Sequence, residues 1–519
     1  MTFSSSKMST HAHPRQNMIA LVAICLATLM FSLEISSVPV ILPTLEVLWH
    51  AEFKDMQWIM NAYTIGCTTI LMAAGTLADR FGRKRILIIT LILFGIASLI
   101  CGLAQNVNVL IWGRFFQGIS GGAMLICQIA ALSHQFQEGA ERSRAFAIWG
   151  VILGIGLGFG PIIGSMIIAL LNWQWVLLIH VPIAAIAVLL VSTHVIESKD
   201  PDAKKLDIWG VVTLSLSVFG FAYFITQGPE LGFGSTTALA IFVASIFGLF
   251  LFWTVEQKNP YPMFDFSVFR ARNFSGAIMG SIGMNFSFWP FIIYLPIYFQ
   301  SGLGYDVVST GLSLLAYTLP TLVIPPVAER LSLRYQSGII IPLGLFTIGL
   351  GFMLMWFGAS VTHVSWLTML PGCALAGVGL GLTNTPVTNT ATAAVSSSRA
   401  GMASGIDMSA RLITLAINIA LMGFILQVGV MSYLKSALNT AFNPTQLLLL
   451  STKIASGSLT SLTQSFPALS VLDSTGVIAH AALNRGFTLV MLYGGLGVWI
   501  LAFLSFLIFN VKRRQVVIN

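Results

Sequence analysis

The chain has 519 residues, of which 56% are hydrophobic and only 8% are charged, and its mean hydropathy is +0.87. Soluble globular proteins carry about 25% charged residues, so this composition excludes a water-soluble globule and predicts a protein embedded in the lipid bilayer. The net charge of +8 does not indicate nucleic acid as a partner, because the basic residues lie in loops beside apolar segments, where membrane proteins concentrate them.

Apolar stretches of the length that crosses a bilayer, about 20 residues, recur along the whole chain. We count fourteen, which predicts an all-α polytopic membrane protein. Their approximate ranges are 18–42, 56–78, 86–104, 106–133, 145–170, 173–195, 208–227, 235–255, 273–298, 308–328, 337–358, 365–391, 401–430 and 486–510.

Lysine and arginine are distributed unevenly over the predicted loops. Twenty of the 26 fall in the tails and in the loops on the side of the N-terminus, four fall on the opposite side, and Arg114 and Arg411 lie inside spans. Since cytoplasmic loops carry the excess of basic residues, both termini of this multi-pass protein are predicted to be cytoplasmic.

Two charged segments divide the chain. Residues 197–207 hold the densest cluster of charges, and 256–272 form a second polar segment, so spans seven and eight are bracketed as a separate pair. The predicted order is a cytoplasmic tail (1–17), a six-helix bundle (18–196), a linker with two additional transmembrane helices (197–272), a second six-helix bundle (273–510) and a cytoplasmic tail (511–519). Within the second bundle, 431–485 is expected to be an external loop in which Leu447 to Leu450 contribute to a short interfacial or hairpin element.

The most informative segment, residues 75–85, joins the second predicted span to the third. Its two glycines permit a tight turn and a close approach of helices, and Asp79 supplies one negative charge among four basic residues. A carboxylate at this position pairs with, or releases, its neighbours as the helices move, which predicts a cytoplasmic gate. The candidate gating residues are Gly75, Asp79, Arg80, Gly82 and Arg83.

Two ionisable residues lie deep inside predicted spans. Arg114 in span four costs about 2.5 to 3.5 kcal/mol to bury on insertion scales, which favours a functional role over a structural ion pair or a snorkelling side chain. Gln117 lies one turn on, and Glu34 in span one is the nearest candidate acid. Glu34 is the first candidate for a proton carrier; the alternative is a permanently neutral, hydrogen-bonded core acid.

Span five carries glycine at every fourth position, at Gly156, Gly160 and Gly164, with Pro161 in mid-helix. Such a stripe is typical of close helix packing, and the proline adds a kink. We therefore predict a flexible hinge helix at the interface of the two halves. A dinucleotide-binding loop is excluded because no strand precedes the glycines.

In span 13, Asp407 and Arg411 are spaced to face each other on one helix. Mutual neutralisation and a second titratable or cation-attracting site both remain open for this pair. Residues that are weaker candidates for lining a substrate cavity are Tyr63, Gln117, Trp149, Asn285, Tyr294 and Asn384. The five cysteines have no paired spacing, so no metal site is expected. The sequence also contains no cluster of catalytic residues, so an enzyme is not expected.

With these motifs, the chain resembles the fourteen-helix drug:proton antiporter branch of the major facilitator superfamily over nearly its whole length. Residues 75–85 are similar to the superfamily signature between helices 2 and 3, Arg114–Gly118 to its helix 4 motif, and Gly156–Gly164 to its helix 5 antiporter motif. Further branch-specific agreements are Trp58–Tyr63, Trp173–Trp175, Asp207–Gly210, Leu295–Gln300 and Gly401–Gly405.

The resemblance implies the major facilitator fold, two six-helix bundles plus two extra central helices, and alternating access. In that scheme the Asp79 loop is the cytoplasmic gate, Arg114 couples to the proton site, and the glycine helix favours exchange over symport. The expected function is proton-coupled export of a lipophilic drug or toxic compound, driven by the proton gradient without a cofactor; the alternative is an endogenous metabolite such as a siderophore or a lipid.

Three positions depart from the branch. Glu34 stands where aspartate is usual, Gln174 replaces an arginine, and His180 replaces an asparagine. The longer acid keeps the proton-carrier role but alters the shape of the cavity. His180 is expected to be a hydrogen-bonded helix residue, and the alternative is a titratable group. Besides lipid, protons and the substrate, candidate partners are a periplasmic adaptor and an outer-membrane channel that dock on 431–485.

Overall fold

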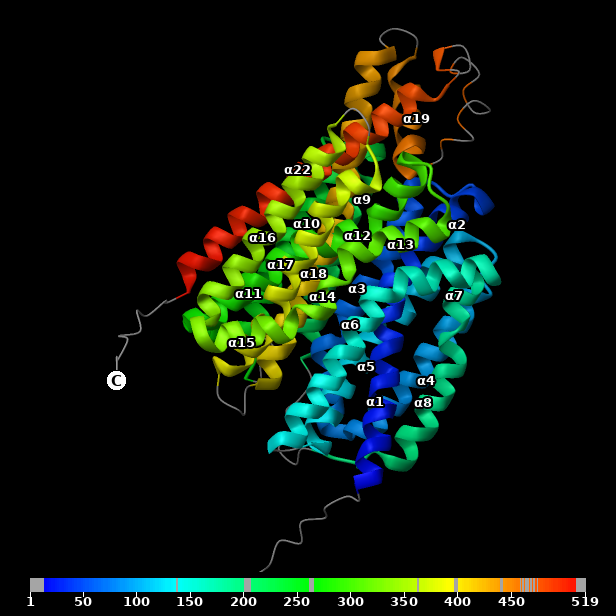
Figure 1. Cartoon of the computed structure of the whole chain (residues 1–519). Helices are drawn as coiled ribbons and strands as arrows, with labels where there is room; N and C mark the ends of the chain where they lie inside the picture. Colours follow the sequence, from blue (N-terminus) through cyan, green and yellow to red (C-terminus); the bar gives the residue numbers. More distant parts are fainter. Residues whose placement is uncertain are drawn as a thin grey trace, which may run out of the picture.

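The computed structural model shows a bundle of long helices in which those of the second half, such as α16 and α22, are inclined to α1 of the first half (Figure 1). It describes residues 14–509 except 137–138, 200–206, 261–265, 362–363, 396–399, 439–441, 458, 460–461, 463–465, 467–468, 470–471 and 474. The described residues contain helices and no strand, which confirms the all-α prediction. The predicted terminal tails therefore lie mostly outside the described residues, as does most of the charged cluster 197–207.

The first half comprises the helices before the charged linker. They are α1 (Pro14–Ser37), a 3₁₀ turn (Val38–Ile41), α2 (Leu42–Trp49), α3 (Phe53–Phe81), α4 (Arg83–Gly102), α5 (Val107–Gln135), α6 (Gly139–Leu170), α7 (Gln174–Leu178) and α8 (His180–His194). The two prolines after Glu34, at 39 and 43, lie in the 3₁₀ turn and the first turn of α2, where the chain departs from regular α-helix.

The additional pair consists of α9 (Ile208–Leu231) and α10 (Thr236–Lys258). The second half follows with a 3₁₀ turn (Phe266–Arg270), α11 (Arg272–Phe286), α12 (Phe288–Ile297), the π-helical turn η3 (Tyr298–Gly302), α13 (Val307–Thr318), α14 (Pro320–Val323), α15 (Pro325–Tyr335), α16 (Ser337–Ala359), α17 (Trp366–Ala393), α18 (Ala400–Leu438), α19 (Pro444–Ser456) and α22 (Val477–Ile508).

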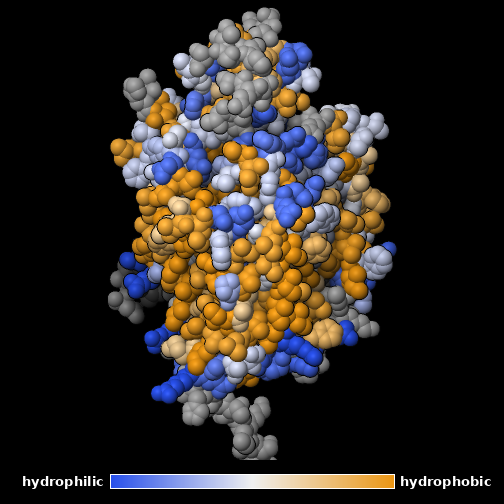
Figure 2. All heavy atoms as spheres, turned by 90° about the vertical axis from the view of Figure 1, so that its right-hand side faces the viewer, coloured by the Kyte–Doolittle hydropathy of each residue, from blue (hydrophilic) through white to orange (hydrophobic). Residues whose placement is uncertain are grey.

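Thirteen stretches of the described chain are long and apolar enough to cross a membrane, and each overlaps one predicted span. The remaining predicted span, 56–78, lies inside α3, which has 29 residues but is not one of the thirteen. Polar residues such as Gln57 and Asn61 lower the hydropathy of α3. Figure 2 shows a broad hydrophobic belt between hydrophilic residues at both ends of the molecule, as expected for a surface in contact with lipid.

The bundle has two ends, which we call the basic end and the far end. The basic end holds the junction of α3 and α4 and the start of α11, with Arg80, Arg83 and Arg272. The far end is the opposite one, where α2 ends and where α3, α5 and α13 begin.

Residues 431–485 are more regular than the external loop that was expected. Helix α18 continues to Leu438, α19 occupies Pro444–Ser456, and α22 begins at Val477. Leu447 and Leu450 are buried in α19, in agreement with the short element expected there. Asp473 caps α22 by accepting hydrogen bonds from the backbone N–H groups of Ile478 and Ala479. We call α19 and the described residues 457–476 the cap; it lies at the far end, at the top of Figure 1.

The glycine stripe of α6, at Gly156, Gly160 and Gly164, packs on α1 within the first half. A Cβ on Gly156 would lie 1.9 Å from Ser32 Oγ, and one on Gly160 would lie 1.8 Å from Ser36 Oγ, both on α1. Ser36 Oγ also donates a hydrogen bond to the carbonyl of Gly156 (2.8 Å). The glycines therefore allow the backbones of α1 and α6 to touch.

The opposite face of α6 meets the second half. Gly158, about 200° around the helix from Gly156, accepts a hydrogen bond from Thr318 Oγ1 of α13 at its carbonyl (2.6 Å). A Cβ on Gly154 would lie 3.1 Å from the side chain of Leu322 in α14. Glycines on both faces thus place α6 between α1 and the second half.

The halves also meet where α3 lies beside α18, and the α9–α10 pair packs against this contact. A small apolar cluster joins Leu214, Val218 and Phe252 of the pair to Ile65 of α3 and Ala416 of α18. The outward surface of α10 is exposed and apolar, with Phe247 and Phe250 more than half exposed. The additional helices therefore cover one seam of the bundle and face lipid on their other side.

Candidate functional site: two buried acid–arginine clusters

Glu34 and Arg114 form a buried ion pair inside the first half. Both side chains are fully buried, and Arg114 Nη1 donates a hydrogen bond to Glu34 Oε1. The second carboxylate oxygen, Oε2, lies 2.8 Å from His180 Nε2, an ion-pair distance when the imidazole is protonated. Three ionisable groups from α1, α5 and α8 thus meet at one point; we call them the Glu34 cluster.

The surroundings fix the Arg114 guanidinium. Its Nε donates to the carbonyl of Ile59 (3.2 Å), and Nη1 also donates to Gln117 Oε1 (2.8 Å). Gln117 is held in turn, because its Nε2 donates to Ser98 Oγ (2.8 Å). The guanidinium carbon lies 4.4 Å from the centre of the Tyr63 ring, a cation–π contact. The structure therefore brings Glu34, Arg114, Gln117 and Tyr63 together.

His180 is the member of the cluster that sequence reasoning did not place. It was noted as a departure from the branch but was expected to be an ordinary hydrogen-bonded helix residue. Instead, it is fully buried at the start of α8, with its ring edge-on to Phe94 at 5.6 Å between centres. The signal available in the sequence was the coincidence of two departures, a longer acid at Glu34 and an ionisable ring at His180.

A second cluster lies in the other half. Asp407 is fully buried and accepts hydrogen bonds from Arg411 Nε (3.1 Å) and Nη2 (3.0 Å) and from Ser281 Oγ. Arg411 also donates to Asn384 Oδ1 (2.6 Å) and to Thr388 Oγ1 (2.8 Å). Helices α11, α17 and α18 thus satisfy both charges, so the structure contains the mutual pairing of Asp407 and Arg411; we call these residues the Asp407 cluster.

The two clusters lie at opposite depths. Arg114 is seven residues into α5, which begins at the far end, so the Glu34 cluster is about 10 Å from that end along the helix. Asp407 is seven residues into α18, which begins at the basic end, so its cluster is about 10 Å from the opposite face. The bundle therefore carries one buried acid–arginine pair toward each side.

The predicted cavity residues do not gather in one pocket. Asn285 donates to the carbonyl of Ser281 beside the Asp407 cluster (2.9 Å), and Asn384 belongs to that cluster. Tyr63 and Gln117 contact Arg114 of the Glu34 cluster instead. Trp149 lies on α6 and is half-buried.

Two further polar side chains lie inside the first half. Asn61 of α3 and Gln128 of α5 are buried, and their amide groups have no hydrogen-bond partner among the described residues. Sequence reasoning missed these two, which are available to water or to a polar ligand.

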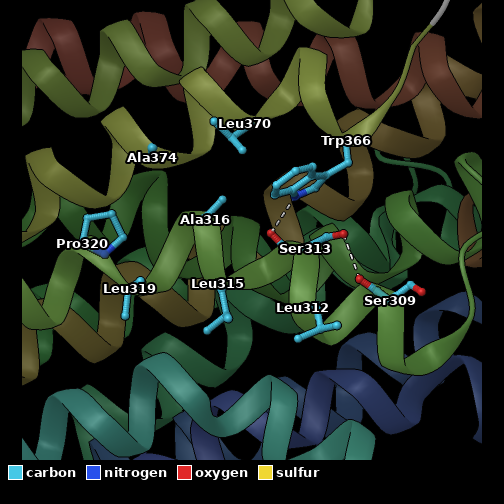
Figure 3. Close-up of a pocket in the computed structure, with 10 residues that line it drawn as sticks. All are labelled: Ser309, Leu312, Ser313, Leu315, Ala316, Leu319, Pro320, Trp366, Leu370 and Ala374. Carbon is cyan, nitrogen blue, oxygen red and sulfur yellow. Dashed lines mark hydrogen bonds between the residues drawn. The ribbon is translucent and has the colours of Figure 1, made fainter.

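One apolar cavity of about 630 Å³ lies between α13 and α17 (Figure 3). Leucine and alanine side chains from both helices line the cavity. Trp366 also lines it, and its indole N–H donates a hydrogen bond to the carbonyl of Ser313 (3.3 Å). It holds none of the predicted cavity residues. Among the described residues, no group of three or more metal-ligating side chains is present.

Tyr294, another predicted cavity residue, joins the two halves toward the far end. Gln57 Nε2 of α3 donates to its hydroxyl (3.1 Å), and the hydroxyl donates to the carbonyl of Ile419 in α18. The Phe53 ring lies 6.2 Å from the Tyr294 ring. α3 of the first half is therefore tied to α12 and α18 of the second.

We expect Tyr294→Phe and Gln57→Leu to lower stability by about 0.5–1.5 kcal/mol each, because each removes a buried hydrogen bond. Together they should cost less than the sum, since they remove the same contact. Thermal unfolding of the two single variants and the double variant in detergent measures this coupling. Strict additivity would show that the contact does not join the halves in solution.

The predicted gate forms a tight junction at the basic end. Gly75 and Asp79 lie in the last turns of α3, and the Asp79 side chain is outside the described part. The exposed Arg80 lies over the Phe81 ring, 5.5 Å from its centre. Gly82 ends α3 with φ +109°, a conformation that favours glycine.

A carboxylate from a segment distant in sequence binds at the junction of α3 and α4. The Glu197 side chain accepts hydrogen bonds from the backbone N–H groups of Lys84 (3.1 Å) and Arg85 (3.2 Å), and the Arg83 N–H donates to the carbonyl of Ser198 (3.0 Å). A negative charge at the start of α4 complements the helix dipole. Glu197 was expected only as part of a charged linker, because its contact with α4 is not encoded in local sequence.

The model of the Major Facilitator Superfamily matches residues 24–417. The chain belongs to this superfamily. A multidrug resistance protein, Stp, of Mycobacterium tuberculosis is 30% identical over 427 residues, 82% of this chain and 79% of its own length. The puromycin resistance protein pur8 of Streptomyces alboniger is 29% identical over 80% of this chain and 82% of its own length.

Another relative, the tetracenomycin C resistance and export protein of Streptomyces glaucescens, is 27% identical and covers 78% of this chain. Among solved structures, the human organic anion transporter MFSD10 superposes with a TM-score of 0.59 at 13% identity, covering 95% of this chain and all of that one. This likeness shows the major facilitator fold. The chain is therefore a multi-pass membrane transporter of the superfamily, with relatives that act in drug resistance and efflux.

Proposed function

We propose that the protein exports a lipophilic drug or toxic compound across the bacterial inner membrane in exchange for protons. The observation that carries this proposal is the Glu34 cluster, a fully buried carboxylate shared by an arginine and a histidine, in a chain whose relatives export or confer resistance to drugs. Buried ionisable residues in membrane proteins commonly serve ion pathways and proton relays. The energy source is the proton gradient, with no cofactor.

The chemistry of exchange follows from the ion pair. A proton that reaches Glu34 neutralises the carboxylate and weakens its hold on Arg114, which remains positioned by Ile59, Gln117 and the Tyr63 ring. Release of that proton restores the pair. Substrate binding and protonation are then alternatives for one site, because each changes the charge that Arg114 must balance.

Alternating access requires two arrangements of the halves. The contacts of Gln57 with Tyr294 and of Thr318 with Gly158 join them from the middle of the bundle toward the far end. In the proposal these contacts break when the far end opens, and residues 75–85 with Glu197 control the basic end. Gly156, Gly160, Pro161 and Gly164 act as the hinge helix, and Asp407 is a second group in the coupling path.

The basic end is proposed to be cytoplasmic, together with both termini, since arginine and lysine gather on that side. The far end with its cap then faces outward, where an adaptor and an outer-membrane channel are candidate partners. Unchanged efflux in a strain without such adaptors would remove them from the proposal.

The test is proton release on addition of substrate to purified protein in weakly buffered detergent, comparing wild type with Glu34→Gln. Lipophilic cations, neutral drugs and siderophores are screened in parallel, so the ligand that binds also decides between drug and metabolite export. We expect release from the wild type and none from the variant, because glutamine carries no exchangeable carboxyl proton. Unchanged release in the variant would transfer the role to Asp407, and binding without release would refute antiport.

A further inference from the structure

A cavity of about 690 Å³ lies at the far end, and no residue of either buried cluster lines it. Three parts of the chain form its wall: α2 of the first half, η3 with Gly304 of the second half, and the cap together with the first turn of α22. Ligand pockets commonly measure about 300–1,000 Å³, so the cavity has the size of a small-molecule site.

The wall combines one buried acid with apolar side chains. Glu46 of α2 is only 8% exposed, and Val47, Leu48 and Leu459 provide much of the apolar surface beside it. Lys453 of α19, a half-buried residue of the cap that does not line the cavity, contributes a favourable positive charge at longer range. A buried carboxylate in an apolar wall is stabilised by a cation that binds directly beside it.

A hydrogen-bond donor comes from a different segment of the wall. Gln300 of η3 has a buried Nε2 without a hydrogen-bond partner among the described residues. Ser301 and His480 line the same cavity and add polar groups near the solvent. A ligand that satisfies this arrangement carries a positive charge, an apolar body and a hydrogen-bond acceptor.

We propose that this cavity is a second binding site, which takes amphiphilic organic cations at the far end of the bundle. The ligand's cation pairs with Glu46, its acceptor reaches Gln300, and its apolar body covers Leu48 and Leu459. This inference rests on the proposed function, for which it supplies the site where the exported molecule pauses before release. Since the wall comes from both halves and the cap, an occupied site also links the position of the cap to that of the halves.

The experiment reports on this cavity alone. Ser301→Cys places a thiol in the wall, and its rate of modification is measured in purified protein with a trimethylammonium methanethiosulfonate and with the anionic sulfonate analogue. The background is the same protein without the substitution. We expect faster reaction with the cation and protection by ethidium.

Charge substitutions give results of opposite sign. Glu46→Gln should lower the cation-to-anion rate ratio roughly fivefold and abolish ethidium protection, whereas Lys453→Gln should raise the ratio, as expected for charges acting over several ångströms at a partly buried site. Thr236→Cys, exposed at the same end but outside the cavity, is the matched control: its ratio should not respond to Glu46→Gln.

The failures are distinguishable. No modification at Ser301→Cys, or a ratio that ignores both Glu46→Gln and Lys453→Gln, would overturn the second site while leaving proton-coupled export untouched. Ethidium protection that depends on Glu46 in a protein that exports no drug would support the site and refute the proposed function.

Discussion

Arg114→Ala should lower the free energy of unfolding by about 3–5 kcal/mol and abolish transport. The reason is that removing one partner of a buried ion pair leaves the other charge buried without compensation. Glu34 would retain only His180 as an ionisable partner, and the side-chain oxygen of Gln117 would lose the hydrogen bond from Arg114. Thermal or denaturant unfolding in detergent, alongside efflux in cells, measures both effects.

The control is a partner substitution that removes the stranded charge. Arg114→Ala combined with Glu34→Gln should regain a large part of the lost stability, because no ionised carboxylate remains in the core, but should still be inactive. Arg114→Lys should keep the charge yet lose the fixed geometry of three hydrogen bonds, so stability should fall less than activity. A double variant no more stable than Arg114→Ala would show that the pair is not coupled.

Gly160→Ala should be the second most damaging change, with a loss of about 1–3 kcal/mol or more. The new methyl group would lie 1.8 Å from Ser36 Oγ, so α1 and α6 must separate. Because α1 carries Glu34, this separation should also displace the carboxylate from Arg114 and slow transport. Unfolding in detergent and the efflux rate are the two measurements.

The same helix offers a matched control. A Cβ on Gly150 would meet no atom within 4 Å, so Gly150→Ala should be neutral or raise stability by about 1 kcal/mol through helix propensity. Ser36→Gly should partly rescue Gly160→Ala, since it removes the side chain that clashes. Equal effects of alanine at positions 150 and 160 would rule out close packing of α1 on α6.

The helical architecture and the partners of Arg114 were accessible from sequence because both follow from strong local rules. Apolar length defines a spanning helix, and a guanidinium inside one requires an acid, of which Glu34 is the candidate at matching depth. The same reasoning did not reach His180 as a partner. Its depth depends on how the chain turns through α7, which is a tertiary property.

Other differences between the predictions and the structure also arise from tertiary packing. The glycine period of α6 predicted close packing but not the neighbour, because Gly156 and Gly158 lie on opposite faces and sequence does not tell which helix each face meets. Leu447 to Leu450 indicated a short element within 431–485, but the polar composition did not predict the full helix α19, in which Leu447 and Leu450 are buried. The Glu197 contact with α4 and the Glu46 cavity join segments distant in the chain, which no local pattern records.

The α9–α10 pair makes the two seams between the halves mechanically unequal. Along α3 and α18, relative movement must carry two further helices and displace the apolar cluster around Leu214 and Phe252. Along α6 and α13, the glycine backbone lies directly against Thr318 with little side-chain volume between them. In the proposed alternation of access, the seam along α3 and α18 must therefore rearrange more side chains than the seam along α6, so the motion should be asymmetric, with α6 and α13 near its axis.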